Sequence, residues 1–224
     1  MFLHIPDVLS REQVADIRHL LATAAWVDGH GAPGDLCAPA HLQLDEHDPL
    51  TWRLGDVIAD ALGRSALFAA AALPLRVFPP IFERDRAVTP LPSQVDDAVR
   101  TLPGSPLRLR ADLSGMVFLS DPADYEGGDL VVTDAFGAYA AKERAGHVVL
   151  YPSSVEHAIR PVTGGVRLAA RFWVQSLIRD REPRDLLLDL DMTIKRLTAS
   201  GADADAIDQL GRLYQRLVRR WAEL

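Results

Sequence analysis

Three polar residues, Asp96, His157 and Arg167, have side chains that could support metal chemistry if folding brings them together. Iron that activates oxygen is often held by two His and one carboxylate on one face, with open positions for other ligands. Asp96 lies in a proline-bounded loop, far from His157 in the sequence. A lone His near a turn is more often a hydrogen-bonded structural residue, and acidic loop residues are more often solvated. The pattern alone leaves both interpretations open.

Arg167 follows His157 across a turn formed by Thr163-Gly164-Gly165. A hairpin at this turn would place a cation beside a metal-bound ligand. A guanidinium is planar, bidentate and always charged, which suits it to hold a carboxylate of a dicarboxylic acid. The residues therefore allow an anion site next to the candidate metal site, although these features alone are a weak signal.

Helices are predicted on both sides of these residues. Ser10 and Gln13 form a capping-box pattern, and the apolar residues that follow have helical spacing: Val14, Ile17, Leu20, Leu21 and Ala24. Asp48-Pro49 predicts the start of a second helix that runs to about Gly63. The tail has two apolar stripes, Leu186, Leu190, Ile194 and Leu197, then Ile207, Leu210, Tyr214, Leu217 and Trp221.

Between the helices the pattern changes to short strands separated by turn residues. The predicted strands are 75–84, 107–120, 129–133, 138–142, 147–151, 158–161 and 166–176. This pattern is typical of a sandwich or a double-sheet jelly roll. We predict a mainly β protein of one domain, 1–224, with N-terminal helical support in 1–74, a β core in 75–178 and C-terminal helices in 179–224.

Composition excludes several function classes. The chain has 224 residues and a net charge of −7, so it lacks the positive field that attracts nucleic acid. Its only cysteine, Cys37, excludes an intrachain disulfide and a Cys-based zinc site. The longest apolar run, 66–73, stops at Pro74, and the first residues do not resemble a signal peptide. These features predict a cytoplasmic protein with no membrane partner, and they are compatible with a homo-oligomer.

Several segments resemble the bacterial PKHD-type hydroxylases. They include Tyr125-Glu-Gly-Gly-Asp-Leu-Val-Val132, Val149-Leu-Tyr-Pro-Ser-Ser154 and Trp173-Val-Gln-Ser176. Further similar segments are 4–10, 26–29, 67–74, 112–114, 118–122, 157–167 and 177–180. The resemblance covers nearly the whole chain, and the joint pattern is highly specific.

The resemblance implies a double-stranded β-helix (jelly-roll) barrel that uses iron(II), 2-oxoglutarate as cosubstrate and ascorbate as a supporting reductant. It assigns His157 and Asp96 as metal ligands and Arg167 as the residue that binds 2-oxoglutarate. Gln94 departs from the family, which has His at this position. An amide oxygen is a neutral, weaker donor than an imidazole nitrogen, so this change should lower the affinity for iron.

Other departures surround the same predicted pocket. Asp85 stands where the family usually has a Tyr that contributes to the cosubstrate pocket, and the segment 89–93 replaces an aromatic, Gly-containing approach. Arg171 replaces an apolar residue and, on an alternating strand, shares a face with Arg167 and Trp173. Two interpretations stay open: Arg171 pairs with Asp85 inside the barrel, or Asp85 lies at a solvated strand end and Arg171 reaches outward.

Three other histidines are predicted to have no ligand role at this site. His147 stands where the family has Asp, and its place at a distant strand end favours a surface role. His30 and His41 are predicted in loops, with no partner at ligand spacing.

Two functions from different classes fit the sequence. The first is an iron(II)/2-oxoglutarate-dependent oxygenase that hydroxylates a small-molecule substrate, with Gln94, Asp96 and His157 at the metal. The second is a metal-free, non-catalytic barrel that binds a small anion or a protein partner. The kept residues Asp96, His157 and Arg167 favour the enzyme, and the changes at 85 and 94 favour the binding protein.

Overall fold

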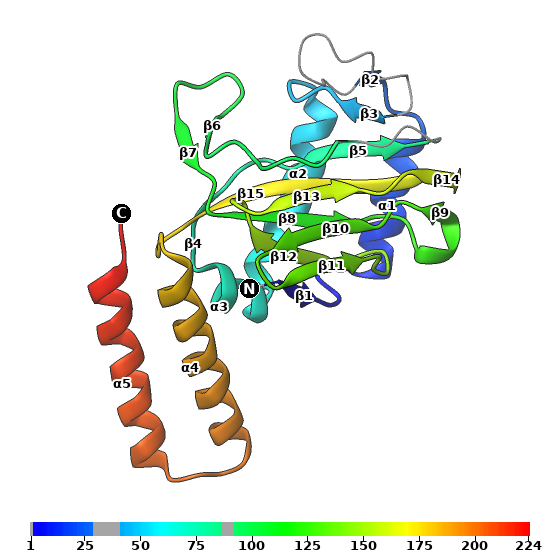
Figure 1. The fold of residues 1–224 in the computed structure, drawn as a ribbon. Helices are drawn as coiled ribbons and strands as arrows, with labels where there is room; N and C mark the ends of the chain where they lie inside the picture. Colours follow the sequence, from blue (N-terminus) through cyan, green and yellow to red (C-terminus); the bar gives the residue numbers. More distant parts are fainter. Residues whose placement is uncertain (1, 29–40, 87–91) are drawn as a thin grey trace.

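The computed structural model describes residues 2–28, 41–86 and 92–224, and two sheets dominate it (Figure 1). The larger sheet has the order β1-β12-β8-β15-β5-β3-β2, and β4 also pairs with β15. Its strands are β1 Leu3–Ile5, β12 Val148–Pro152, β8 Leu113–Phe118, β15 Arg167–Ser176, β5 Ile81–Asp85, β3 His41–Leu44, β2 Trp26–Asp28 and β4 Pro74–Val77. The segment 1–74, expected as helical support, therefore also contributes three strands, of which β1 and β2 are the edges of the larger sheet.

The smaller sheet has the order β11-β10-β13, with β11 Gly137–Ala141, β10 Leu130–Asp134 and β13 Glu156–Ile159. Two antiparallel pairs complete the strands: β9 Tyr125–Gly127 with β14 Val162–Gly165, and β6 Val99–Thr101 with β7 Arg108–Arg110. A buried core joins the two sheets: Met116, Phe118, Val149, Tyr151 and Ala169 from the larger, and Leu130, Val132 and Ala141 from the smaller. This arrangement is the predicted jelly roll.

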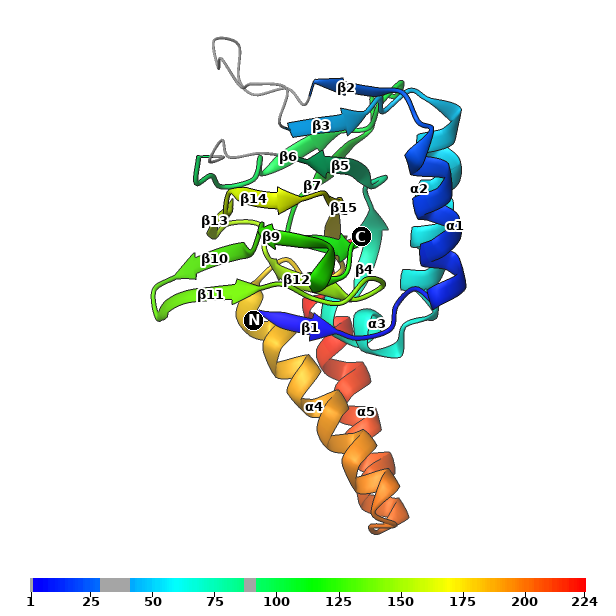
Figure 2. The same ribbon diagram turned by 90° about the vertical axis from the view of Figure 1, so that its right-hand side faces the viewer.

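Helices cover the other face of the larger sheet (Figure 2). They are α1 Arg11–Ala22, α2 Pro49–Arg64 and the short α3 Ala66–Ala72. Their buried residues join Leu150, Ala170 and Phe172 of the sheet in one core. The predicted caps are confirmed, because Ser10 and Gln13 form a reciprocal capping box and the Asp48 side chain accepts a hydrogen bond from the Leu50 amide.

Two predicted strands are broken in the structure. The segment 75–84 divides into β4 and β5 because Pro79 and Pro80 have no amide hydrogen to donate to a sheet. The segment 107–120 divides into β7 and β8 at Asp112, whose carboxylate binds Arg110 and accepts a hydrogen bond from the Ser176 amide. The first break leaves both strands in the larger sheet, whereas the second leaves β7 in a separate pair with β6.

The last two helices, α4 Arg181–Ala199 and α5 Ala204–Trp221, form a hairpin that extends away from the sheets (Figures 1 and 2). The apolar stripe predicted for α4 is partly wrong. Leu187 and Leu188 are the buried leucines, whereas Leu186 is 52% exposed. In α5, no residue is fully buried. The other three residues of the predicted stripe, Leu190, Ile194 and Leu197, are half-buried, so only its first residue is misplaced.

The loop expected at 29–39, with Cys37 and His30, and most of the altered segment 89–93 lie outside the described residues. Within the described part of the chain, no helix has both the length and the apolar composition needed to cross a membrane.

Candidate active site

His157 and Asp96 converge between the two sheets, as predicted. His157 lies on β13, and its Nε2 is 3.8 Å from Asp96 Oδ2, with each side chain 3% exposed. The Asp96 carboxylate accepts a hydrogen bond of 2.6 Å from Ser114 Oγ, which also contacts Ser153 Oγ at 2.7 Å. Folding therefore places a carboxylate and an imidazole nitrogen together at the end of a buried hydroxyl network.

The state of the His157 ring suits a metal ligand. Its Nδ1 faces the Val155 carbonyl oxygen at 3.4 Å, whereas its buried Nε2 has no hydrogen-bond partner among the described residues. A ring that donates from Nδ1 carries its lone pair on Nε2, which is the arrangement that metal-binding His residues usually have. Burial lowers the pKa of His157 although Asp96 raises it, so the neutral ring is favoured. The unpaired acceptor nitrogen of His157, next to the Asp96 carboxylate, therefore fits a binding site for a divalent cation.

Gln94 lies opposite His157 in an isolated antiparallel bridge. The backbone N–H of Gln94 donates to the backbone carbonyl of His157 at 2.9 Å, and the backbone N–H of His157 donates to the backbone carbonyl of Gln94 at 2.8 Å. Residues directly opposite each other project their side chains to the same face. Both line a cavity of about 90 Å³ together with Glu83 and Arg171. Gln94 itself is exposed at the edge of this cavity.

Arg167 points into the protein and is fully buried. Its Nη1 is 2.5 Å from Asp85 Oδ2, and its Nη2 is 2.7 Å from Met116 Sδ. The register of β15 on β5 causes this pairing, because Arg167 lies directly opposite Asp85. Arg167 is therefore paired inside the protein, and its partner is a carboxylate of the chain itself.

His41 completes a three-residue ionic group with Asp85 and Arg167. The loop placement of His41 is wrong, because it begins β3 and lies opposite Asp85 of β5. Its Nδ1 is 2.5 Å from Asp85 Oδ1. Burial opposes the charge of both groups, but the hydrogen bond between them raises the pKa of His41 and, with the Arg167 charge, lowers the pKa of Asp85. Asp85 is thus held as an anion by Arg167 and His41.

Arg171 pairs with Glu83 at 2.9 Å, so the proposed Arg171–Asp85 pair is wrong. The alternative is also wrong, because Asp85 is only 6% exposed and the Arg171 side chain lines the cavity. Strand register is the reason: Arg171 lies opposite Ile81, which places Glu83 diagonally within its reach. Sequence reasoning missed Glu83, although its alternation with Asp85 on 81–85 put both on one face.

Trp173 shares the inner face of β15 but packs in a separate buried cluster with Phe78, Ile81 and Leu109. The Arg100 guanidinium lies 3.6 Å from its ring centroid, and Arg171 is 5.2 Å away. Trp173 is not among the residues that line the 90 Å³ cavity. Its ring contacts the Arg171 guanidinium from the end of β15 that lies away from the cavity.

Comparison with known proteins decides the family. A PKHD-type hydroxylase of Parvibaculum lavamentivorans is 46% identical over 99% of both chains. One of Burkholderia thailandensis is 48% identical over 100% of both chains. The chain belongs to the PKHD-type hydroxylase family. A model of the PKHD-type hydroxylase C-terminal domain matches residues 182–223, which form the α4–α5 hairpin.

Solved structures agree on the fold of this PKHD-type hydroxylase. HygX of Streptomyces hygroscopicus, with nickel and 2-oxoglutarate bound, has a TM-score of 0.54 at 19% identity, covering 80% of this chain and 85% of HygX. The α-ketoglutarate-dependent epimerase SnoN of nogalamycin biosynthesis has a TM-score of 0.55 at 17% identity, covering 79% of this chain and 78% of SnoN. The chain therefore shares its jelly-roll fold with these two proteins.

Proposed function

We propose that this PKHD-type hydroxylase is an iron(II)/2-oxoglutarate-dependent oxygenase whose metal ion is held by Asp96 and His157, with the amide oxygen of Gln94 as third ligand. The observation that carries the proposal is the buried His157 Nε2, which has no hydrogen-bond partner in the described structure and faces the Asp96 carboxylate at 3.8 Å. Imidazole and carboxylate are ligands that suit non-haem iron.

When bound, iron(II) and 2-oxoglutarate supply the oxygen chemistry, and the chain supplies orientation and a dry pocket. Ser114 holds the Asp96 carboxylate through its hydroxyl, and the Val155 carbonyl orients the His157 ring. Both side chains are 3% exposed, which limits access of bulk water to the ligands. A small-molecule substrate would reach this site beside the exposed Gln94.

Arg167 is the residue proposed to bind the distal carboxylate of 2-oxoglutarate, but Asp85 already occupies it. The guanidinium is fully buried and Asp85 is held by His41 as well. A cosubstrate carboxylate would therefore have to displace Asp85 from Arg167. A variant without the Asp85 carboxylate should therefore bind the cosubstrate more tightly than the parent does.

The same Asp85–Arg167 pair favours a second candidate, a non-catalytic barrel that binds a small anion or a protein partner. In that case the internal carboxylate replaces the cosubstrate permanently, and the Gln94 change reflects loss of the metal. The 90 Å³ cavity is small beside ordinary ligand pockets of about 300–1,000 Å³. The two candidates differ in whether iron binds at all.

Anaerobic iron(II) binding tests the metal site directly. We expect the parent protein to bind one iron that Asp96→Ala or His157→Ala abolishes, because each removes a buried ligand. Asp97→Ala is the matched control, since the Asp97 side chain is 84% exposed one residue away. Gln94→His should raise the affinity, because imidazole binds iron better than an amide oxygen does.

Three outcomes separate the candidates. Iron in the parent, together with 2-oxoglutarate turnover in the presence of ascorbate, supports the oxygenase. Iron only in Gln94→His points to a barrel that lost its metal. Iron in neither variant overturns the metal assignment and leaves the binding protein.

Calorimetric titration with 2-oxoglutarate tests the anion site. Asp85→Ala should bind 2-oxoglutarate about tenfold more tightly than the parent, a difference of about 1.4 kcal/mol, because it frees Arg167. The double variant Asp85→Ala/Arg167→Ala should lose this gain. Equal affinity in the parent and both variants would remove Arg167 from the site.

A further inference from the structure

A second group of His and carboxylate side chains lies outside the candidate active site. His4 Nε2 is 3.0 Å from His147 Nδ1 and 3.1 Å from Glu143 Oε2. One ligand atom from each residue lies within 4.8 Å of the other two. No step of the proposed oxygenase reaction uses these residues.

Strand pairing brings the three residues together from distant parts of the sequence. On β1, His4 lies opposite Val149 of β12, and His147 comes directly before β12, so His4 and His147 are diagonal neighbours on one face. Glu143 follows β11, the edge strand of the smaller sheet, whereas β1 is an edge of the larger sheet. The group therefore spans the open edges of the two sheets.

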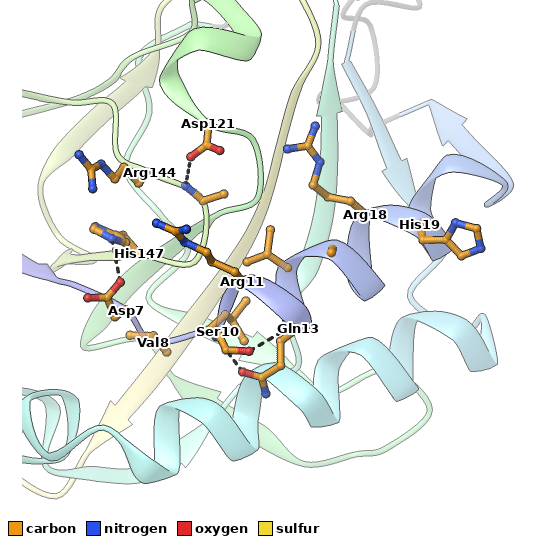
Figure 3. Close-up of a pocket in the computed structure, with 14 residues that line it drawn as sticks. Asp7, Val8, Ser10, Arg11, Gln13, Arg18, His19, Asp121, Arg144 and His147 are labelled. Carbon is orange, nitrogen blue, oxygen red and sulfur yellow. Dashed lines mark hydrogen bonds and ion pairs between the residues drawn. The ribbon is translucent and has the colours of Figure 1, made fainter.

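Hydrogen bonds among His4, Glu143 and His147 cannot satisfy all the acceptor atoms of these three side chains. His147 Nε2 is 3.4 Å from Asp7 Oδ1, and a neutral ring that donates to Asp7 carries a lone pair on Nδ1 (Figure 3). His4 Nε2 faces both that lone pair and the Glu143 oxygen. A neutral His4 has at most one hydrogen there and can satisfy only one of the two acceptors. A cation would satisfy all three ligand atoms together.

The spacing also fits a first-row transition metal. A tetrahedral zinc ion bound at 2.0–2.1 Å holds its ligand atoms about 3.3 Å apart, close to the 3.0 and 3.1 Å that separate His4 Nε2 from His147 Nδ1 and Glu143 Oε2. The ligand atoms of His147 and Glu143 lie within 4.8 Å of each other. The Asp7 carboxylate on the second nitrogen of His147 is the usual outer partner of a metal-binding His. The His4 side chain is 43% exposed, which leaves room for a water ligand.

We propose that His4, Glu143 and His147 form a second metal site that binds a divalent transition-metal ion such as zinc. The ion ties the N-terminal strand β1 to the segment between β11 and β12. This position is beside the surface groove of about 1220 Å³ that Asp7, Arg11 and His147 line at the start of α1 (Figure 3). The role is structural, because the ion joins two sheet edges.

Calorimetric titration of chelator-treated full-length protein with zinc chloride tests the proposal. His4→Asn, Glu143→Ala and His147→Asn should each lower the affinity of one zinc equivalent by about a hundredfold, and Asp7→Asn by about tenfold. His19→Asn is the matched control, because His19 lines the same groove, is exposed and belongs to no ligand group in the described structure. Circular dichroism checks that each variant keeps its fold.

Thermal unfolding gives a second readout. A ligand that binds only the folded state stabilises it, so zinc at about a hundredfold excess over Kd should raise the Tm of the parent by about 5 °C. Zinc should not raise the Tm of His147→Asn by binding at this site, because the variant lacks one of its ligands. Zinc binding that all three ligand variants leave unchanged, or no zinc binding by the parent, would overturn the proposal. Asp96→Ala and His157→Ala should leave this equivalent in place, so failure here is distinct from failure of the active-site proposal.

Discussion

The two faces of strand β15 differ sharply, although they alternate along the same ten residues. The face toward the helices is apolar: Leu168, Ala170, Phe172 and Val174. The face between the sheets carries Arg167, Ala169, Arg171 and Trp173. The apolar face contributes through burial alone, whereas the charged face depends on partners supplied by β5. A strand can thus stabilise the fold on one side and keep a polar site on the other.

The charged face needs its partners because a buried charge without one is strongly destabilising. Arg167 pairs with Asp85, and Arg171 pairs with Glu83. Replacing such pairs by apolar residues is often neutral or stabilising. Stability is therefore a weak reason for these four charges.

The largest effect is expected on the apolar face. Phe172 is fully buried and packs edge-on against Phe68, with ring centroids 6.1 Å apart. Phe172→Ala should lower the free energy of unfolding by about 4 kcal/mol, because it removes apolar area and leaves a cavity. Urea unfolding measures the change, with Phe136→Ala, at an 86% exposed site, as control. A loss no larger than that of the control would contradict the assigned packing.

Breaking the buried ion pair should come next. Asp85→Asn leaves the buried Arg167 charge uncompensated and should cost about 3 kcal/mol. Arg167→Met should cost less, because His41 still pairs with Asp85. In the double variant, the loss should be smaller than the sum of the single losses, which a double-mutant cycle in urea measures. Additive losses would mean that the two side chains do not interact.

Glu83→Gln should have a smaller effect on the same face. The Arg171 side chain is 16% exposed and also lies over the Trp173 ring, so it keeps other interactions when Glu83 loses its charge. We expect a loss of about 1 kcal/mol in urea unfolding. A loss as large as that of Asp85→Asn would show that Arg171 is as dependent on its partner as Arg167.

The smallest effect on stability is expected from the pH dependence of the ionic group formed by His41, Asp85 and Arg167. The pKa of His41 is raised in the fold, so its stabilisation is fully present below its usual 6.5 and is lost as pH rises through the folded pKa. The pKa of Asp85 is lowered, so its part is fully present above its usual 3.8 and is lost as pH falls through the folded pKa. The difference in Tm between the parent and His41→Asn should therefore be largest near pH 5 to 6.

A series of melting curves from pH 5 to 9 checks this prediction. The difference between the two proteins should shrink steadily above pH 6.5. Any effect of the lowered His157 pKa is common to both proteins and cancels in the comparison. A difference that grows with pH would mean that His41 is not held charged by Asp85.

The sequence by itself determined the local features of this protein. The Ser10 capping box, the start of α2 at Pro49 and the alternation on β15 follow from spacing along a continuous segment. The family resemblance placed Asp96 and His157 at one site, and the structure brings them to 3.8 Å. Spacing along one segment carries this information because side chains on the same face of a helix or strand recur at a fixed interval in the sequence.

Only the tertiary structure decided which charges meet. Asp85 pairs with Arg167 and not with Arg171, and Glu83 takes Arg171, because the register of β5 on β15 sets the partners. His4 and His147 meet through the pairing of β1 with β12. Each strand displays the same alternation in any register, so register depends on the packing of distant segments against one core.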